Sequence, residues 1–279
     1  MKAALALLPP ALLYLSGASM ALSQGVPTTQ PNLITIVREE VKLGHNAAHA
    51  AHEAGWPAAY ARAKSPDTYL AMVAMTGANE TWYVTSYTSH TVMGESMKRE
   101  SADPVLTAEL QRLARVDADH LNSLRVVHAA ARPDLSHGAF PDLALARFWE
   151  ITTFRVRPGH EAGFADAAKA YAASAKRASP NASWRTYEVV AGLPGPTYLV
   201  FSSVQSFGEL DQVMEGGQAI MKAATPDEMA ALQKFSTVGL INTETQRFRL
   251  DPGQSYVDAA TKAKDPGFWA PRRRAAARP

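Results

Sequence analysis

Three histidines follow one another at helical spacing in an alanine-rich segment. His45, His49 and His52 are separated by steps of four and then three residues, so on a helix they lie on one face. Two imidazoles one helical turn apart can chelate a divalent metal ion, and Glu53, one turn after His49, could supply a carboxylate. The spacing therefore predicts a metal site on His49 and His52, with His45 and Glu53 as further candidates.

The same histidines fit two interpretations that need no metal. The second half of the chain carries Phe164 where the first half has His49, which favours a packing role for this histidine. A histidine on this face could instead contact a ligand or transfer a proton near neutral pH. The order of residues is not the His-Glu-x-x-His of zinc proteases. Nothing in the sequence requires a cofactor, but the chain could bind a divalent metal ion.

Two further residues are candidates for proton transfer. Glu39 interrupts an apolar, β-branched run over residues 33–41, which predicts a strand. Because side chains alternate along a strand, Glu39 faces the same way as Val37 and Val41, and burial would raise the pKa of its carboxyl group. A charged strand end in contact with solvent is the alternative. The second candidate is His90, just beyond a strand expected over 81–88.

Composition excludes several classes of protein. The chain has 279 residues, of which 47% are hydrophobic, enough to build a buried core. It contains no cysteine, so a thiol nucleophile, a disulfide scaffold and an iron–sulfur cluster are excluded. We find neither a Gly-x-Ser-x-Gly motif nor a phosphate-binding glycine loop. No strong catalytic motif remains.

The elements that would position these residues occur twice. A shift of 115 residues aligns Gly44-His45 with Gly159-His160 and Tyr83 with Tyr198. Each copy has the order strand, helix, two strands, helix, strand, with its first helix over 45–63 or 160–178. The sequence therefore predicts an α+β fold of two tandem ferredoxin-like βαββαβ repeats, over residues 31–135 and 146–252.

The openings of the two repeats resemble those of a known superfamily. Val41-Lys-Leu-Gly-His45 and Val156-Arg-Pro-Gly-His160 each join a strand to a helix, as in the dimeric α+β barrel superfamily, here in a fused two-repeat form. Its members include antibiotic-biosynthesis-type monooxygenases, haem-binding enzymes and lactone isomerases. The resemblance implies a pseudo-dimeric barrel with a central cavity, but it does not choose among these chemistries.

Aromatic residues on the strands suggest what the cavity would bind. We expect an exported protein that binds a small, mostly apolar ligand between the two repeats. The alternative is a cofactor-independent, monooxygenase-like enzyme of the same barrel type. The residues expected to line the cavity are Trp82, Tyr83, Trp149, Phe154 and Tyr198.

The two ends of the chain differ in character from its body. Residues 1–23 have a lysine, an apolar stretch and terminal small residues, as in a cleaved signal peptide, which predicts export to the periplasm or outside the cell. Pro9-Pro10 shortens the stretch, so we expect no permanent membrane span. Residues 253–279 are predicted to be a disordered tail. Because the basic residues gather in that tail, we expect no nucleic-acid partner. We expect the protein to be either a monomer or a homodimer.

Overall fold

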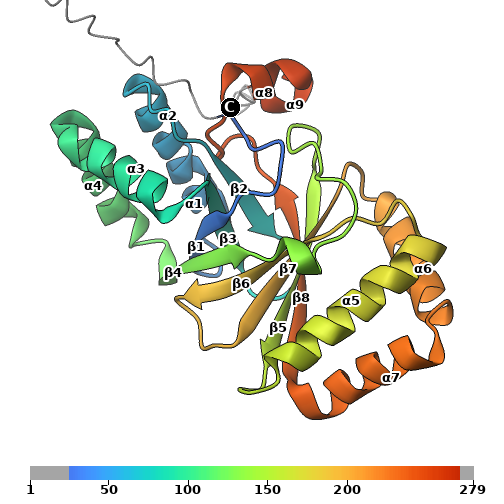
Figure 1. The fold of residues 1–279 in the computed structure, drawn as a ribbon. Helices are drawn as coiled ribbons and strands as arrows, with labels where there is room; N and C mark the ends of the chain where they lie inside the picture. The colour runs from blue at the N-terminus through green and yellow to red at the C-terminus, as the bar shows by residue number, and fades with distance from the viewer. Residues whose placement is uncertain (1–24, 271–279) are drawn as a thin grey trace, which may run out of the picture.

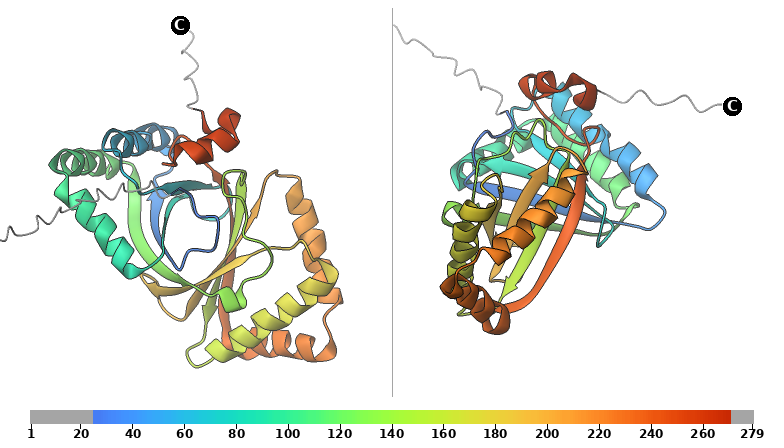
Figure 2. Two further views of the ribbon diagram at one scale, coloured as in Figure 1. Left: turned by 45° about the horizontal axis from the view of Figure 1, so that its top comes forward. Right: turned by 90° about the vertical axis from the view of Figure 1, so that its right-hand side faces the viewer.

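The computed structural model describes residues 25–270, and the predicted signal peptide lies outside this range. Eight antiparallel strands close into a barrel in the order β1-β3-β2-β8-β5-β7-β6-β4 (Figure 1). Figure 2 shows the helices outside the barrel in two groups, α1 to α4 against one side and α5 to α7 against the other. The chain is thus a mixed α+β protein with a closed barrel.

The first half of the chain supplies strands β1 to β4 and helices α1 to α4. Its strands pair in the order β2-β3-β1-β4. The elements are β1 (Leu33–Val41), α1 (Asn46–Glu53), α2 (Gly55–Arg62), β2 (Tyr69–Ala74), β3 (Glu80–Tyr87), α3 (His90–Ala102), α4 (Pro104–Asp117) and β4 (Leu121–Ala131).

The second half supplies strands β5 to β8, which pair in the order β6-β7-β5-β8, and β8 and β6 join the two halves through β2 and β4. Within residues 25–270, no helix has the length and apolar character needed to cross a membrane. The elements are β5 (Phe148–Val156), α5 (Glu161–Ala178), β6 (Arg185–Ala191), β7 (Thr197–Val204), α6 (Glu209–Lys222), α7 (Pro226–Lys234), a π-helical turn (Phe235–Gly239), β8 (Leu240–Leu250), α8 (Ala259–Lys264) and α9 (Pro266–Trp269).

Local sequence signals explain several helix boundaries. The Asp103 side chain accepts hydrogen bonds from the first backbone amides of α4, and Thr225 forms a capping box with Glu228 at the start of α7. The single helix expected over 45–63 is instead divided at Ala54. Pro57 explains the break, because it has no amide hydrogen to donate to the carbonyl group four residues earlier.

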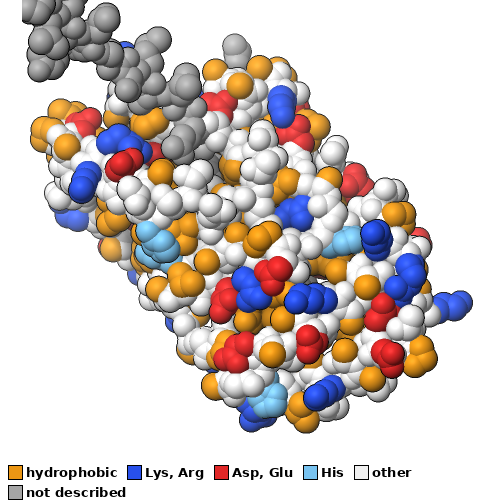
Figure 3. Space-filling model, in the orientation of Figure 1, with side chains coloured by type: hydrophobic (Ala, Val, Ile, Leu, Met, Phe, Trp, Pro, Cys, Tyr) orange, Lys and Arg blue, Asp and Glu red, His pale blue; other side chains and the backbone are white. Residues whose placement is uncertain are grey.

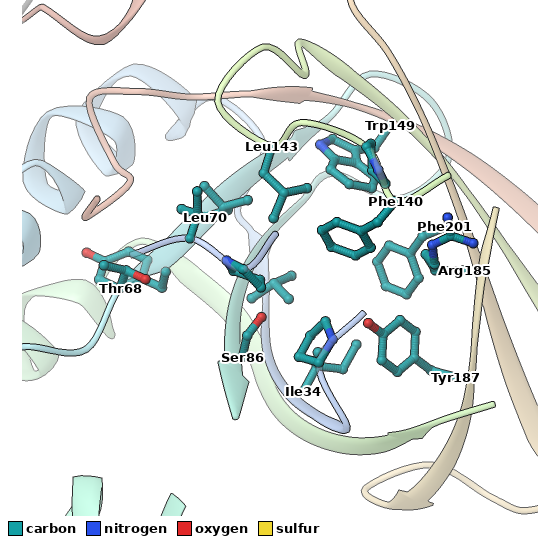
Figure 4. Close-up of a pocket in the computed structure, with 16 residues that line it drawn as sticks. Ile34, Thr68, Leu70, Ser86, Phe140, Leu143, Trp149, Arg185, Tyr187 and Phe201 are labelled. Carbon is teal, nitrogen blue, oxygen red and sulfur yellow. The ribbon is translucent and has the colours of Figure 1, made fainter. Parts of the chain in front are cut away.

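The interior of the barrel is filled by large side chains. The Trp82 and Phe248 rings lie 4.8 Å apart, and the Trp149 and Phe201 rings lie 6.2 Å apart. A cavity of about 50 Å³, room for a few water molecules, remains beside Trp149 and Phe201 (Figure 4). Aromatic rings occupy the interior in which we expected the ligand cavity, so the structure gives that prediction no support.

The expected disorder of residues 253–279 is also wrong for the part of that segment that the structure describes. Helices α8 and α9 pack at one end of the barrel (Figure 2), and Trp269 is only 4% exposed. Its indole Nε1 donates a hydrogen bond to the Ala144 carbonyl oxygen at 3.0 Å, and the Arg147 guanidinium lies 3.8 Å from the centre of the Phe268 ring. Burial of these two aromatic rings explains the order of the segment.

Candidate functional site

Four ionisable side chains meet between β1 and the helices on its outer side. We call Glu39, His49, Glu53 and Asp117 the buried acidic cluster. One donor atom from each residue lies within 4.8 Å of those of the other three. The His49 Nε2 atom is 2.9 Å from Glu39 Oε2 and 3.6 Å from Asp117 Oδ1. No member is more than 4% exposed, so three carboxyl groups and one imidazole share a site shielded from water.

Strand and helix periodicity place these groups together. Glu39 is on the outward face of β1, whereas its neighbour Arg38 is on the inward face, where its guanidinium stacks on Trp82 at 4.4 Å. His49 and Glu53 are four residues apart, one turn of α1, and both turn toward β1. The last residue of α4, Asp117, completes the cluster. It is distant in sequence from the other members, and no local pattern pointed to it.

The cluster holds more hydrogen-bond acceptors than donors. Burial, together with the neighbouring Asp117, raises the pKa of Glu39 to about 9. Burial also raises the pKa of Glu53 to about 8, helped by Glu39 and Asp117, while Tyr83 and His49 act in the opposite direction. Glu53 Oε1 and Asp117 Oδ1 are buried without a hydrogen-bond partner. Such a group can share protons or hold a cation.

The structure separates the histidines that the sequence placed in one metal site. The Nε2 atom of His52 is 2.9 Å from the Leu113 carbonyl oxygen, and Nδ1 of His45 is 3.1 Å from Nδ1 of His120. The pairing of His49 with His52 is therefore wrong. The side of α1 that faces β1 carries His49 and Glu53, and a step of three residues turns His52 away from that side.

The proposed proton-transfer candidates also lie apart. Glu39 is part of the buried acidic cluster, whereas His90 is exposed at the start of α3. The sequence contained the cue for Glu39, a single carboxylate on the apolar face of a strand. It contained no comparable cue for the environment of His90.

A cavity of about 720 Å³ lies on the outer face of the second half of the barrel. Strands β5, β6 and β7 form its floor, and α5, α6 and α7 form its walls (Figure 1). Two glycines of α6 help to keep the cavity open. A Cβ atom at Gly216 would lie 3.1 Å from Ser179 Oγ, and a Cβ atom at Gly217 would lie 3.8 Å from the Tyr171 hydroxyl oxygen. The larger apolar residues of the lining are Phe154, Phe164, Tyr171, Trp184, Val200 and Ile220.

Polar groups also line this outer cavity. Glu150 lies on its floor, and its Oε2 atom is 2.9 Å from Nε of Arg247. Thr152 and Ser202 lie beside it on β5 and β7. The rings of Tyr171 and Trp184, which also line the cavity, have their centres 5.4 Å apart. The cavity therefore offers both apolar and polar contacts to a ligand.

The five aromatic residues expected to line one cavity do not converge. Trp82 is in the barrel core, and the Tyr83 hydroxyl donates a hydrogen bond to Gln254 Oε1 at 3.0 Å. Trp149 borders the small interior cavity, and Phe154 borders the outer cavity. Tyr198 stacks on Phe164 with ring centres 4.1 Å apart. Alternation along the strands sends these rings to opposite faces of the sheet.

Charged side chains are mixed on the molecular face seen in Figure 3. Lys and Arg residues lie next to Asp and Glu residues across this face. Ion pairs join such residues, for example Arg132 with Glu188 at 2.8 Å and Arg177 with Glu228. This face therefore carries no extended patch of one sign.

The fold resembles that of several solved structures of low sequence identity. A proposed monooxygenase from Fusobacterium nucleatum subsp. nucleatum matches with a TM-score of 0.51 at 9% identity, covering 80% of this chain and 94% of that one. A second proposed monooxygenase, from Lactobacillus acidophilus, gives a TM-score of 0.49 at 7% identity, covering 82% and 97%. A mutant chlorite dismutase from Candidatus Nitrospira defluvii gives 0.48 at 10% identity, covering 81% and 93%.

The match to the Fusobacterium structure shows that the closed barrel of this chain has a fold similar to that of a solved structure. The sequence itself matches no family model and no curated protein. The likeness therefore concerns the fold, and function has to be argued from the sites of this chain.

Proposed function

We propose that the protein binds a small, mostly apolar molecule in the outer cavity of the second half. The carrying observation is the volume of about 720 Å³, within the range of about 300–1,000 Å³ that small-molecule sites occupy. The interior cavity of about 50 Å³ is too small for such a ligand. We therefore propose the ligand site on the outer face of the barrel and not in its interior.

The lining suggests how such a ligand would be oriented. Aromatic rings at Phe164, Tyr171 and Trp184 offer a large apolar surface. The Glu150 carboxylate and the Ser202 hydroxyl offer polar contacts on the floor. A molecule with an extended apolar body and hydroxyl or amino groups matches this mixed lining.

We also propose that the barrel consists of two ferredoxin-like repeats, over residues 31–135 and 146–252. In support, the strands of both halves pair in the same order. A register irregularity also falls just before the last residue of both β1 and β5. Bulges are specific features of a strand that are kept within protein families, so a shared position favours a common origin of the two halves.

The strand register revises the alignment of the proposed repeats. Val37 pairs with Tyr83 in the first half, whereas Thr152, the residue aligned with Val37, pairs with Val200 in the second. Tyr83 therefore corresponds to Val200 and not to Tyr198. A slip of two residues keeps each side chain on its face of the sheet, which is why the hydrophobic pattern did not reveal it.

A monooxygenase-like enzyme is the second candidate. The fold likeness to the Fusobacterium protein, described as a proposed monooxygenase, is one supporting observation. The other is the pairing of a carboxylate, Glu150, with an aromatic enclosure large enough for a substrate. In this case the bound molecule would be the substrate, and oxygen consumption in its presence would separate the two candidates.

Binding can be tested with a neutral fluorescent probe. N-phenyl-1-naphthylamine has a phenyl and a naphthyl group joined by one amine, which fits a lining of aromatic and polar residues. We expect saturable binding to the folded protein, and native mass spectrometry of the complex should give one probe per chain. Absence of saturable binding, together with no small molecule retained by the purified protein, would reject the proposed function.

We further propose export of the protein, on the basis of residues 1–23 alone. The protein would act as a monomer or a homodimer and would need neither nucleic acid nor a membrane. Cell fractionation with N-terminal sequencing of the mature chain tests the export. Recovery of the chain with Met1 and Lys2 in the cytoplasmic fraction would reject it.

A further inference from the structure

We propose that the buried acidic cluster of the first half is a binding site for one divalent transition-metal ion. The ligands are Glu39, His49, Glu53 and Asp117, supplied by β1, α1 and α4. This site lies outside the cavity of the proposed function and does not depend on it.

The spacing of the four donor atoms suits a single ion. No two of them are more than 4.8 Å apart, about twice the 2.0–2.4 Å that separates such ions from oxygen and nitrogen ligands. Small rotations of the carboxyl groups would bring all four within bonding distance. Because the donors come from three separate elements, one ion would join β1 to both helices.

Two carboxyl groups of the cluster each have an oxygen atom without a hydrogen-bond partner. Asp117 Oδ1 lies 3.6 Å from His49 Nε2, yet it has no hydrogen-bond partner, and its side chain is 4% exposed. Glu53 Oε1 is equally buried and has no partner. A buried acceptor without a partner costs about 1–3 kcal/mol. A cation would satisfy both atoms at once.

Charge balance points the same way. Among the side chains of residues 25–270, His49 alone forms an ion pair with members of the cluster. Three buried carboxyl groups facing a single imidazole leave negative charge that cannot be compensated unless protons or a cation are bound. A divalent ion would reduce a net charge of −3, with His49 neutral, to −1.

The second half of the barrel shows that this packing position does not need polar residues. There Phe154 of β5 and Phe164 of α5 pack with ring centres 5.5 Å apart, and Phe235, after α7, contacts Phe164 at 5.4 Å. Aromatic rings thus close the same contact of strand and helices. The polar set of the first half is costly to fold, so a ligand explains it better than packing does.

The ligand types select the class of ion. Three carboxylates and one imidazole, without sulfur, suit Mn²⁺, Fe²⁺ or Zn²⁺. Mg²⁺ prefers an all-oxygen octahedron that retains several water molecules, which fits a buried site with a histidine less well.

The experiment uses the full chain, stripped with a chelator and then titrated. Free Mn²⁺ is followed by its electron paramagnetic resonance signal, and Zn²⁺ by competition with a chromophoric chelator. We expect one equivalent of at least one of these ions per chain. Asp117→Asn and Glu53→Gln should each weaken binding more than about tenfold, because each removes a charged ligand. Circular dichroism identifies which of the two variants remains folded, and that variant decides the test.

His45→Gln and His52→Gln are the matched controls, since these histidines lie on the same helical segment outside the cluster. They should bind the ion as the wild-type chain does. The proposal is overturned if neither ion binds the stripped protein. It is equally overturned if the folded cluster variant binds as tightly as wild type, or if the control variants lose as much affinity as the cluster variants.

Discussion

The His49 imidazole lies 2.9 Å from the Glu39 carboxylate, at a contact between strand and helix that the second half of the barrel closes with Phe154 and Phe164. The same architecture therefore presents two different outer faces. One face buries ionisable groups, and the other combines aromatic packing with a cavity. Function is best sought on these outer faces, because the interior is filled.

The stability of the metal-free protein should depend on pH through Glu39. Its pKa is raised from the usual 4.5 to about 9 in the folded chain, so the folded state binds the proton more tightly than the unfolded state. The free energy of unfolding should therefore fall as pH rises above about 4.5 and level off above about 9. The slope should reach up to about 1.4 kcal/mol per pH unit for this group. Urea unfolding in the presence of a chelator measures it.

Glu39→Gln is the matched variant for this measurement. An amide cannot ionise, so the fall in unfolding free energy between pH 5 and pH 9 should become smaller. An identical pH dependence in the variant and the wild-type protein would contradict the assignment of the shift to Glu39.

Gly217 should control access to the outer cavity. Gly217→Ala adds a methyl group whose nearest atom is the Tyr171 hydroxyl oxygen at 3.8 Å, and it should stabilise α6 by about 1 kcal/mol. Gly217→Leu adds a side chain at a position that lines the cavity and should weaken binding of N-phenyl-1-naphthylamine more than about tenfold. Fluorescence titration compares the two variants. Equal affinity in both would place the probe elsewhere.

Trp269 should anchor the C-terminal helices. Because its ring is buried against the end of the barrel, Trp269→Ala should lower the free energy of unfolding by about 3–5 kcal/mol. Lys264→Ala, which removes an exposed ion pair with Asp142 nearby, should change it by less than about 1 kcal/mol. Denaturant unfolding tests both. A loss below about 1 kcal/mol for the tryptophan variant would mean that the segment does not contribute to the folded barrel.

The capping box of α7 gives a more local prediction. Thr225 accepts a hydrogen bond from the Glu228 amide, and Glu228 in turn accepts one from the Thr225 amide. Thr225→Ala should cost about 1 kcal/mol, whereas Thr225→Ser should retain most of the stability. Thermal unfolding of the two variants checks the difference, and equal melting temperatures would contradict the role of the cap.

Periodicity predicted the strands better than it predicted the sites. The β-branched run at 33–41 and the strand expected over 81–88 correspond to β1 and β3 of the structure. The helix α3, which is rich in polar residues, and the helix α6, interrupted by two glycines, gave no clear pattern and were not predicted. Their stability comes from tertiary packing, which single-sequence patterns do not record.

For a related reason, only part of the candidate site could be predicted from the sequence. His49 and Glu53 could be paired from helical spacing, and Glu39 could be noticed on its strand. Asp117 joins them only through the packing of α4 against the sheet, and His52 leaves them because of the rotation of α1. The filling of the barrel interior likewise depends on the combined volumes of rings from different strands, such as Trp82 and Phe248.

The most direct test of the ligand-binding proposal is a crystal structure of the protein with N-phenyl-1-naphthylamine. We expect electron density for the probe between the outer face of β5 and β7 and helices α5 and α6, in contact with Phe164 and Trp184. Density inside the barrel, density on the face of the first half, or a probe-free outer cavity at saturating concentration would contradict it.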